Sequence, residues 1–250
     1  MSARLRPAIG ASDPSEARYA IYYAPGVGTP LDEFGRQWLG RAPGDDDDAA
    51  AECAFPCVAD LSPGEVTTVL SSVSHYGFHG TLKAPFFLRS PDLEPALIEE
   101  IKAFANGRRP FDLPPLRLRR MQRYLALTPD GRCAPLDDLA EACVRHFDPY
   151  RRPASETELT RRRAAGLSAR QERHLERWGY PYVLDEFRFH LTLAGPLNGD
   201  AVAAKLTRSL EPYLASVELD AVRVTSICLF IQDRQDHPFR CHGRYPFGRQ

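Results

Sequence analysis

Two stretches of the sequence match each other: Phe78-His79-Gly80-Thr81-Leu82-Lys83-Ala84-Pro85 and Phe189-His190-Leu191-Thr192-Leu193-Ala194-Gly195-Pro196. Both follow the pattern Phe-His-x-Thr-Leu-x-x-Pro, and the two histidines are 111 residues apart. Each copy is followed by a segment with helical periodicity and then by two segments typical of strands. A repeat of this length excludes a solenoid and indicates a duplicated lobe. We therefore predict a bilobal protein with a pseudo-twofold axis between the copies.

Within each copy, polar and apolar residues alternate as they do in a half-buried strand. Side chains at positions i and i+2 share one face of a strand, so His79 and Thr81 point the same way, as do His190 and Thr192. The neighbouring phenylalanines and leucines would then face the core. About a pseudo-twofold axis, the two His-x-Thr pairs would face each other across one cleft.

Two histidines that face one space suit an in-line displacement at phosphorus. A neutral imidazole can take a proton from the attacking oxygen, and a protonated one can give a proton to the leaving oxygen. Threonine hydroxyls can donate to the non-bridging oxygens, where charge develops. The chemistry needs no cofactor, and two histidines without nearby carboxylates make a poor metal site. We expect His79 and His190 to be catalytic and Thr81 and Thr192 to bind phosphate.

Other residues are candidates for the same cleft. Lys83 lies four residues after His79 and Arg188 two residues before His190, so a regular strand would place both on the cleft face. Of the 32 Lys and Arg residues only three are lysines. Lys83 and Arg188 are therefore candidate phosphate-binding cations. The candidate cleft-lining residues, which could stack on a ligand or simply pack, are Tyr22, Tyr76 and Tyr124.

The motifs His79-Gly80-Thr81-Leu82 and His190-Leu191-Thr192-Leu193 resemble those of the two-histidine (2H) phosphoesterase superfamily. That superfamily includes 2′-5′ RNA ligase-like proteins and cyclic phosphodiesterases. The resemblance covers residues 18–235, and the strings YGFHGTLKAPF and WGYPYVLDEFRFHLTLAGPL look like a branch encoded in bacterial phosphonate-utilisation operons. It implies an α+β fold in which two antiparallel β-sheet lobes with outer helices surround a central cleft. It also implies that the histidines act as acid and base.

We expect one domain with three segments. Residues 18-132 would form the lobe with the first motif, residues 133-182 a helical Arg-rich connection, and residues 183-235 the lobe with the second motif. The connection could cover the cleft or bind an anionic substrate, or its arginines could form a solvated helix face. The periodicity predicts strands at 18–24, 76–88, 111–118, 124–128, 187–193, 217–224 and 227–232, and helices at 31–39, 91–106, 136–147, 168–178 and 200–214, with a further helix starting at Ser62.

Composition excludes several classes of protein. The chain has 250 residues, 43% of them hydrophobic, and a net charge of −1, which excludes a disordered chain and argues against a non-specific nucleic-acid coat. No apolar run approaches the length of a membrane span, and the first residues lack an apolar signal segment. We therefore expect no membrane partner and a cytoplasmic protein.

Together these observations predict a metal-independent phosphoric diester hydrolase. Its substrate would be a small cyclic phosphate, either a 2′,3′-cyclic nucleotide or a sugar 1,2-cyclic phosphate, and the resemblance implies a role in phosphonate metabolism. A small phosphorylated substrate is favoured over RNA. Two alternatives remain open: RNA end processing or 2′-5′ ligation by the same histidines, and a non-catalytic module that binds a phosphorylated ligand. The sequence leaves open which histidine is the base.

Overall fold

The computed structural model describes residues 16–41, 55–56, 58 and 61–248. A seven-stranded antiparallel sheet in the order β4-β5-β6-β2-β1-β8-β9 lies beside a two-stranded sheet of β3 and β7. The strands are β1 (Arg18–Tyr23), β2 (Gly80–Phe86), β3 (Phe111–Asp112), β4 (Leu116–Met121), β5 (Tyr124–Pro129), β6 (Leu191–Ala194), β7 (Arg223–Val224), β8 (Ser226–Gln232) and β9 (Arg240–Pro246). The α-helices are α1 (Pro30–Leu39), α2 (Pro63–Ser74), α3 (Glu94–Asn106), α4 (Ala134–His146), α5 (Glu156–Arg163), α6 (Ala169–Trp178) and α7 (Asp200–Leu214).

The large sheet consists of two halves that meet where β2 lies beside β6. One half contains β4, β5 and β6, and the other contains β2, β1, β8 and β9. The pairing between the halves joins Gly80 to Leu191. Gly80 and Leu191 are both the third residue of their motif, so a pseudo-twofold axis passes through this pair. In the order of the sheet, the axis relates β6 to β2, β5 to β1 and β4 to β8. The predicted α+β fold with internal duplication is confirmed.

The small sheet joins the copies a second time. Phe111 of β3 pairs with Val224 of β7, and Asp112 pairs with Arg223. β3 follows α3, and β7 follows α7, so the two strands are again equivalent parts of the repeat. Arg223 Nη1 donates to both carboxylate oxygens of Asp112, at 2.9 and 3.0 Å.

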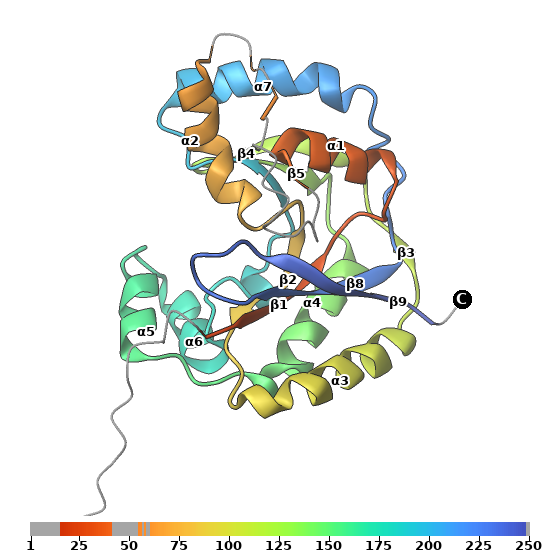
Figure 1. Ribbon diagram of the computed structural model, residues 1–250, viewed down its shortest axis with the longest axis vertical. Coiled ribbons are helices and arrows are strands. Elements are labelled where there is room, and N and C mark those ends of the chain that lie inside the picture. Colours follow the sequence, from red (N-terminus) through yellow and green to blue (C-terminus); the bar gives the residue numbers. More distant parts are fainter. Residues whose placement is uncertain (1–15, 42–54, 57, 59–60, 249–250) are drawn as a thin grey trace, which may run out of the picture.

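Helices cover both halves of the sheet (Figure 1). α3 packs on β8 and β9, α4 packs on β2, and α2 packs on β6. In α1, Trp38 Nε1 donates to the carbonyl of Leu193 at 2.8 Å, and its ring meets Tyr213 of α7 edge-on. α5 and α6 lie together at one side of the molecule, beside the start of β1. None of the helices in the described part of the chain is long and apolar enough to span a membrane.

The strand pairing crosses the segment boundaries expected from the sequence. β4 and β5 belong to residues 18-132 but pair in the half that contains β6, whereas β8 belongs to residues 183-235 but pairs with β1. α2, which precedes the first motif, packs on β6 of the second motif, and α4, which precedes the second motif, packs on β2 of the first. The halves of the sheet therefore exchange elements and do not correspond to continuous segments. Residues 133–182 contain α4, α5 and α6.

Local sequence explains where the elements near the motifs begin and end. Ser62 and Glu65 form a capping box at the start of α2, so this helix forms despite its β-branched residues. α2 runs to Ser74, and Gly77 then turns the chain with φ of +74°, so β2 is shorter than the predicted strand 76–88. β6 starts at Leu191 instead of 187, because residues 184–186 form a 3-10 turn.

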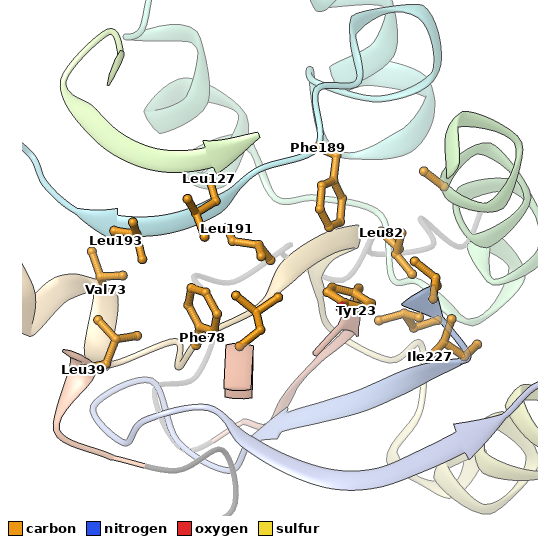
Figure 2. Packing of buried hydrophobic residues seen from close by; sticks show 14 of the residues in the cluster. Tyr23, Leu39, Val73, Phe78, Leu82, Leu127, Phe189, Leu191, Leu193 and Ile227 are labelled. Carbon is orange, nitrogen blue, oxygen red and sulfur yellow. The ribbon is translucent and has the colours of Figure 1, made fainter. Parts of the chain in front are cut away.

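The hydrophobic core lies on the side of the motif strands away from the polar residues. Figure 2 shows Phe78, Phe189, Leu191 and Leu82 within one cluster of buried side chains. The ring of Phe189 lies directly on Gly80, where an added Cβ would overlap the ring. Glycine at this position is therefore required by close packing between the two copies of the motif.

A Gly80→Ala substitution should destabilise the protein, because the Phe189 ring must move to admit the methyl group. We expect the free energy of unfolding to fall by about 1–3 kcal/mol. Gly64→Ala in α2 is the matched control, since a Cβ there meets open space, and it should leave stability unchanged or raise it by up to about 1 kcal/mol. Urea unfolding measures both. Equal stability of the two variants would contradict this account of the interface.

Candidate active site

The polar residues of the two motifs lie together. Because Gly80 pairs with Leu191 in an antiparallel register, His79 lies across from Thr192, and Thr81 lies across from His190. All four side chains are partly exposed, whereas the residues between them are buried. The predicted face that carries both His-x-Thr pairs is therefore present, and it reaches solvent.

Both histidines are anchored in the same way. His79 Nδ1 lies 2.9 Å from the carbonyl oxygen of Gly77, and His190 Nδ1 lies 2.8 Å from that of Arg188. Each carbonyl belongs to the residue two positions before the histidine. Because a carbonyl oxygen only accepts, Nδ1 carries the proton and Nε2 is left for the site. Thr81 Oγ1 lies 3.3 Å from His79 Nε2, within reach to donate to it.

Aromatic rings surround His79. The Tyr22 ring stacks on it with centroids 3.8 Å apart, and the rings of Phe230 and Tyr76 lie 6.2 Å away. Burial lowers the pKa of His79 to about 4, and the nearby His190 lowers it as well, while the hydrogen bond to the Gly77 carbonyl opposes them. At neutral pH His79 is therefore an uncharged imidazole whose Nε2 can accept a proton.

Two buried hydroxyls flank the histidines. Tyr22 Oη and Thr128 Oγ1 have no hydrogen-bond partner among the described residues. Tyr22 stacks on His79, and the pairing of Leu127 with Leu191 puts Thr128 beside His190. Burial raises the pKa of Tyr22, so its hydroxyl stays protonated. Since buried hydroxyls normally have partners, both are available to a bound group. Sequence reasoning missed Thr128, because only the strand register reveals its place.

Lys83 does not share the face of His79. The pairing of β1 with β2 aligns Tyr22 with Thr81 but Ile21 with Lys83, so a β-bulge reverses the side on which Lys83 points. Its Nζ is buried, donates to the Val144 carbonyl at 3.1 Å and lies 3.8 Å from a carboxylate oxygen of Asp148. The expected position of Lys83 in the cleft is wrong, and the lysine belongs to the contact between β2 and α4.

Of the other residues predicted to line the cleft, Tyr76 lies beside His79, whereas Arg188 and Tyr124 lie away from it. Arg188 precedes β6, is exposed, and its Nη1 donates to the carbonyls of Asp185 and Phe187 at 3.2 and 2.6 Å, so it turns back onto the preceding turn. Tyr76 lines the site, because its ring lies near both His79 and Phe239. Tyr124 is 42% exposed at the start of β5 and lies against Gly195, beyond the end of β6.

The donor groups on this face are two imidazoles and several hydroxyls. In the part of the chain that the structure describes, no group of three or more His, Cys, Asp or Glu side chains is arranged to hold a metal ion. Imidazoles and neutral hydroxyls alone form a weak ligand set for a divalent cation, so the face suits an anion better.

A family model described as "Protein of unknown function (DUF1045)" matches residues 81–240, which include the whole second motif. The chain belongs to the DUF1045 family. It also contains the two His-x-Thr-Leu motifs on adjacent strands of a duplicated fold.

Two curated relatives carry the name Ribose 1,5-bisphosphate phosphokinase PhnN. The protein from Janthinobacterium sp. (strain Marseille) is 34% identical over 98% of this chain and 54% of its own length. The protein from Laribacter hongkongensis (strain HLHK9) is 28% identical over 89% of this chain and 50% of its own length. The chain therefore spans about half the length of these relatives.

Several solved structures align with most of this chain. E. coli LigT complexed with NADP+ aligns over 94% of this chain and 99% of its own, with a TM-score of 0.42 and 14% identity. A structure described as a phosphoesterase aligns over 93% and 99%, with a TM-score of 0.41 and 13% identity. Kluyveromyces marxianus Usb1 aligns over 91% and 98%, with a TM-score of 0.37 and 9% identity.

The position of Lys83 can be tested by a Lys83→Met substitution. We expect the variant to lose about 1–3 kcal/mol of stability, since the Val144 carbonyl loses its donor and Asp148 loses a cation. Its KM for a phosphorylated substrate should not change. Urea unfolding and steady-state kinetics on the same preparation separate these effects. A raised KM with native stability would show instead that Lys83 binds phosphate.

Proposed function

We propose that this protein is a metal-independent phosphodiesterase that opens a cyclic phosphate diester to a monoester. The observation that carries the proposal is the pairing of Gly80 with Leu191, which puts both His-x-Thr pairs on one face. Two imidazoles with their Nδ1 protons held by carbonyls present two Nε2 atoms to that face. This is the arrangement that acid–base catalysis by two histidines requires.

His79 is the general base in this proposal, and His190 is the general acid. His79 Nε2 takes a proton from water, whose oxygen forms a bond to phosphorus. The bond from phosphorus to one ring oxygen breaks in line, and protonated His190 gives its Nε2 proton to that oxygen. The product is a phosphate monoester with a free hydroxyl. The low pKa of His79 supports its role as base, because the neutral form dominates at neutral pH.

Hydroxyls stabilise the charge that develops on the non-bridging oxygens. Thr81 and Thr192 lie on the same face as the histidines and can each donate one hydrogen bond. On binding, the phosphoryl group would replace the Thr81 contact with His79 and free Nε2 for the attacking water. The buried hydroxyls of Tyr22 and Thr128 are further donors at the edges of the same site.

The names of the relatives support a phosphoribosyl substrate. Ribose 1,5-bisphosphate phosphokinase is named for a ribose that carries phosphate, and the region shared with this chain makes up about half of that protein. A sugar 1,2-cyclic phosphate or a 2′,3′-cyclic nucleotide contains the same phosphorylated ribose. We therefore favour these over RNA and place the protein in the metabolism of phosphoribosyl compounds, including those formed from phosphonates.

The phosphokinase activity in that name does not suit this chain. A P-loop kinase needs a Gly-x4-Gly-Lys-Ser/Thr loop around the phosphates. The three lysines of this sequence, Lys83, Lys102 and Lys205, are followed by Ala, Ala and Leu. We propose that the shared segment supplies a different step on a related substrate.

Replacing either histidine tests the proposal. His79→Ala and His190→Ala should each lower kcat/KM for a cyclic phosphate by about 10²–10⁴-fold, because each removes a proton-transfer group. His242→Ala, an exposed histidine on β9, is the control and should keep full activity. The assay uses 2′,3′-cyclic nucleotides, a ribose 1,2-cyclic phosphate and short RNAs with 2′-5′ linkages, all with EDTA present.

Each outcome of that panel discriminates between functions. Turnover of the small cyclic phosphates that survives EDTA and depends on both histidines supports the proposal. Turnover of the RNAs alone would assign the protein to RNA processing. Binding of these ligands without hydrolysis would identify a non-catalytic module.

The pH dependence tests the role of His79. A general base must be unprotonated, so kcat/KM should stay high as pH falls from 7 and should decline only as pH approaches about 4, the pKa of His79. A ¹H–¹⁵N titration of the ring assigns the midpoint to this residue. An acidic limb centred near 6.5, the ordinary pKa of histidine, would contradict the assignment of His79 as the base.

A further inference from the structure

A polar cavity lies where α5 approaches the start of β1. Its volume is about 80 Å³, and the residues that line it include Arg18, Pro85, Phe87, Glu158, Arg161 and Arg162. They come from β1, from the end of β2 and from α5, and Thr157 and Gln235 add polar groups. Figure 1 shows α5 and α6 on this side of the sheet.

The cavity carries excess positive charge. Three arginines line it, together with one acidic residue, Glu158. Glu158 is already engaged in a capping box, because its Oε2 accepts from the backbone nitrogen and the hydroxyl of Ser155 at 2.9 and 3.1 Å. In the described part of the chain, no carboxylate forms an ion pair with Arg18, Arg161 or Arg162.

Neighbouring arginines of the same connection behave differently. Arg151 and Arg177 pair with Asp148, Arg163 pairs with Glu172, and Arg170 pairs with Asp185. These four arginines are therefore neutralised by carboxylates within the fold. The arginines of the cavity stand out, since they lie together without such partners, and a ligand would have to supply the negative charge.

Arg162 is held in place for such a ligand. Its guanidinium lies over the ring of Tyr180 at 5.0 Å from the centroid, and its side chain is partly buried. Burial lowers the pKa of Arg162, and the positive charges of Arg161 and Arg18 lower it further, while Tyr180 and Glu158 oppose them. Neighbouring guanidiniums of this kind suit a phosphate oxyanion, because the anion relieves their mutual repulsion and accepts several charge-assisted hydrogen bonds.

Successive side-chain contacts connect this cavity to His79. Arg18, Ala20 and Tyr22 alternate along β1 and so share one face. The Cζ of Arg18 lies 5.2 Å from the centroid of the Phe239 ring, which is 6.3 Å from that of Tyr22, and Tyr22 stacks on His79. Arg18 and Tyr22 are about 13 Å apart along the strand. One extended small molecule can therefore contact both places.

We propose that the cavity of Arg18, Arg161 and Arg162 binds a second phosphoryl group on the substrate whose diester lies between His79 and His190. The ligand class is a sugar or nucleoside cyclic phosphate that also carries a terminal phosphate monoester. The inference rests on the proposed function for the diester end only. The cavity itself is argued from its charges and its place beside Tyr22.

Paired substrates test this specificity. Adenosine 2′,3′-cyclic phosphate is compared with the same compound bearing a 5′-phosphate. The wild-type protein should prefer the 5′-phosphorylated compound by about 10–100-fold in kcat/KM, which corresponds to the loss of charge-assisted hydrogen bonds in its absence. The double variant Arg161→Gln/Arg162→Gln should lose this preference. Arg163→Gln, on the same helix but paired with Glu172, should keep it.

A binding measurement separates failure of the cavity from failure of the proposed function. Ribose 5-phosphate is titrated calorimetrically into the His79→Ala/His190→Ala variant, with and without the two arginine substitutions. Binding that the arginine substitutions abolish supports the cavity, even if no cyclic phosphate is hydrolysed by the wild-type protein. Unaltered binding, or an equal preference for the paired substrates in the wild-type and arginine variants, would overturn it.

Discussion

The pairing of Gly80 with Leu191 is the contact on which the rest of the structure depends. Without it, the two halves of the sheet would not be continuous and the two histidines would belong to separate surfaces. The pair occurs between equivalent residues of the repeat, so it places the pseudo-twofold axis at the centre of the polar face. The contact also requires a residue without a side chain at position 80, because the Phe189 ring occupies that space. The geometry of the polar face and the packing of the core therefore depend on the same residue, Gly80.

The two copies of the motif are alike in backbone but differ in surroundings. Each histidine donates from Nδ1 to a carbonyl two residues before it, which fixes both rings in the same way. Among the described residues, a tyrosine ring stacks on His79 but not on His190, and burial lowers the pKa of His79 to about 4. The duplicated scaffold thus gives two similar groups, and the local environment keeps one of them, His79, uncharged at neutral pH. Tyr22 also lies near the Phe239 ring, and Arg18 of the arginine cavity lies over the same ring.

The sequence predicted the parts that depend on local pattern. Alternation within Phe-His-x-Thr-Leu placed His79 with Thr81 and His190 with Thr192, and the repeat predicted a duplicated α+β fold. The local pattern could not predict which distant strands pair, or in which register. One extra residue in β2, between Thr81 and Lys83, forms a bulge, so the Lys83 side chain points toward the core instead of the polar face. No local sequence pattern predicts that bulge. The exchange of β4, β5 and β8 between the halves is also non-local. For the same reason Thr128, which reaches His190 only through the strand register, was missed.

The central claim is that His79 and His190 act on one phosphoryl group. A crystal structure of the wild-type protein with orthovanadate, a mimic of the five-coordinate phosphorus of the transition state, tests it most directly. The account predicts a single vanadate within hydrogen-bond distance of Nε2 of both histidines, with its equatorial oxygens bound by the hydroxyls of Thr81 and Thr192. Vanadate that contacts one histidine alone, or that binds elsewhere with the two rings turned apart, would contradict it.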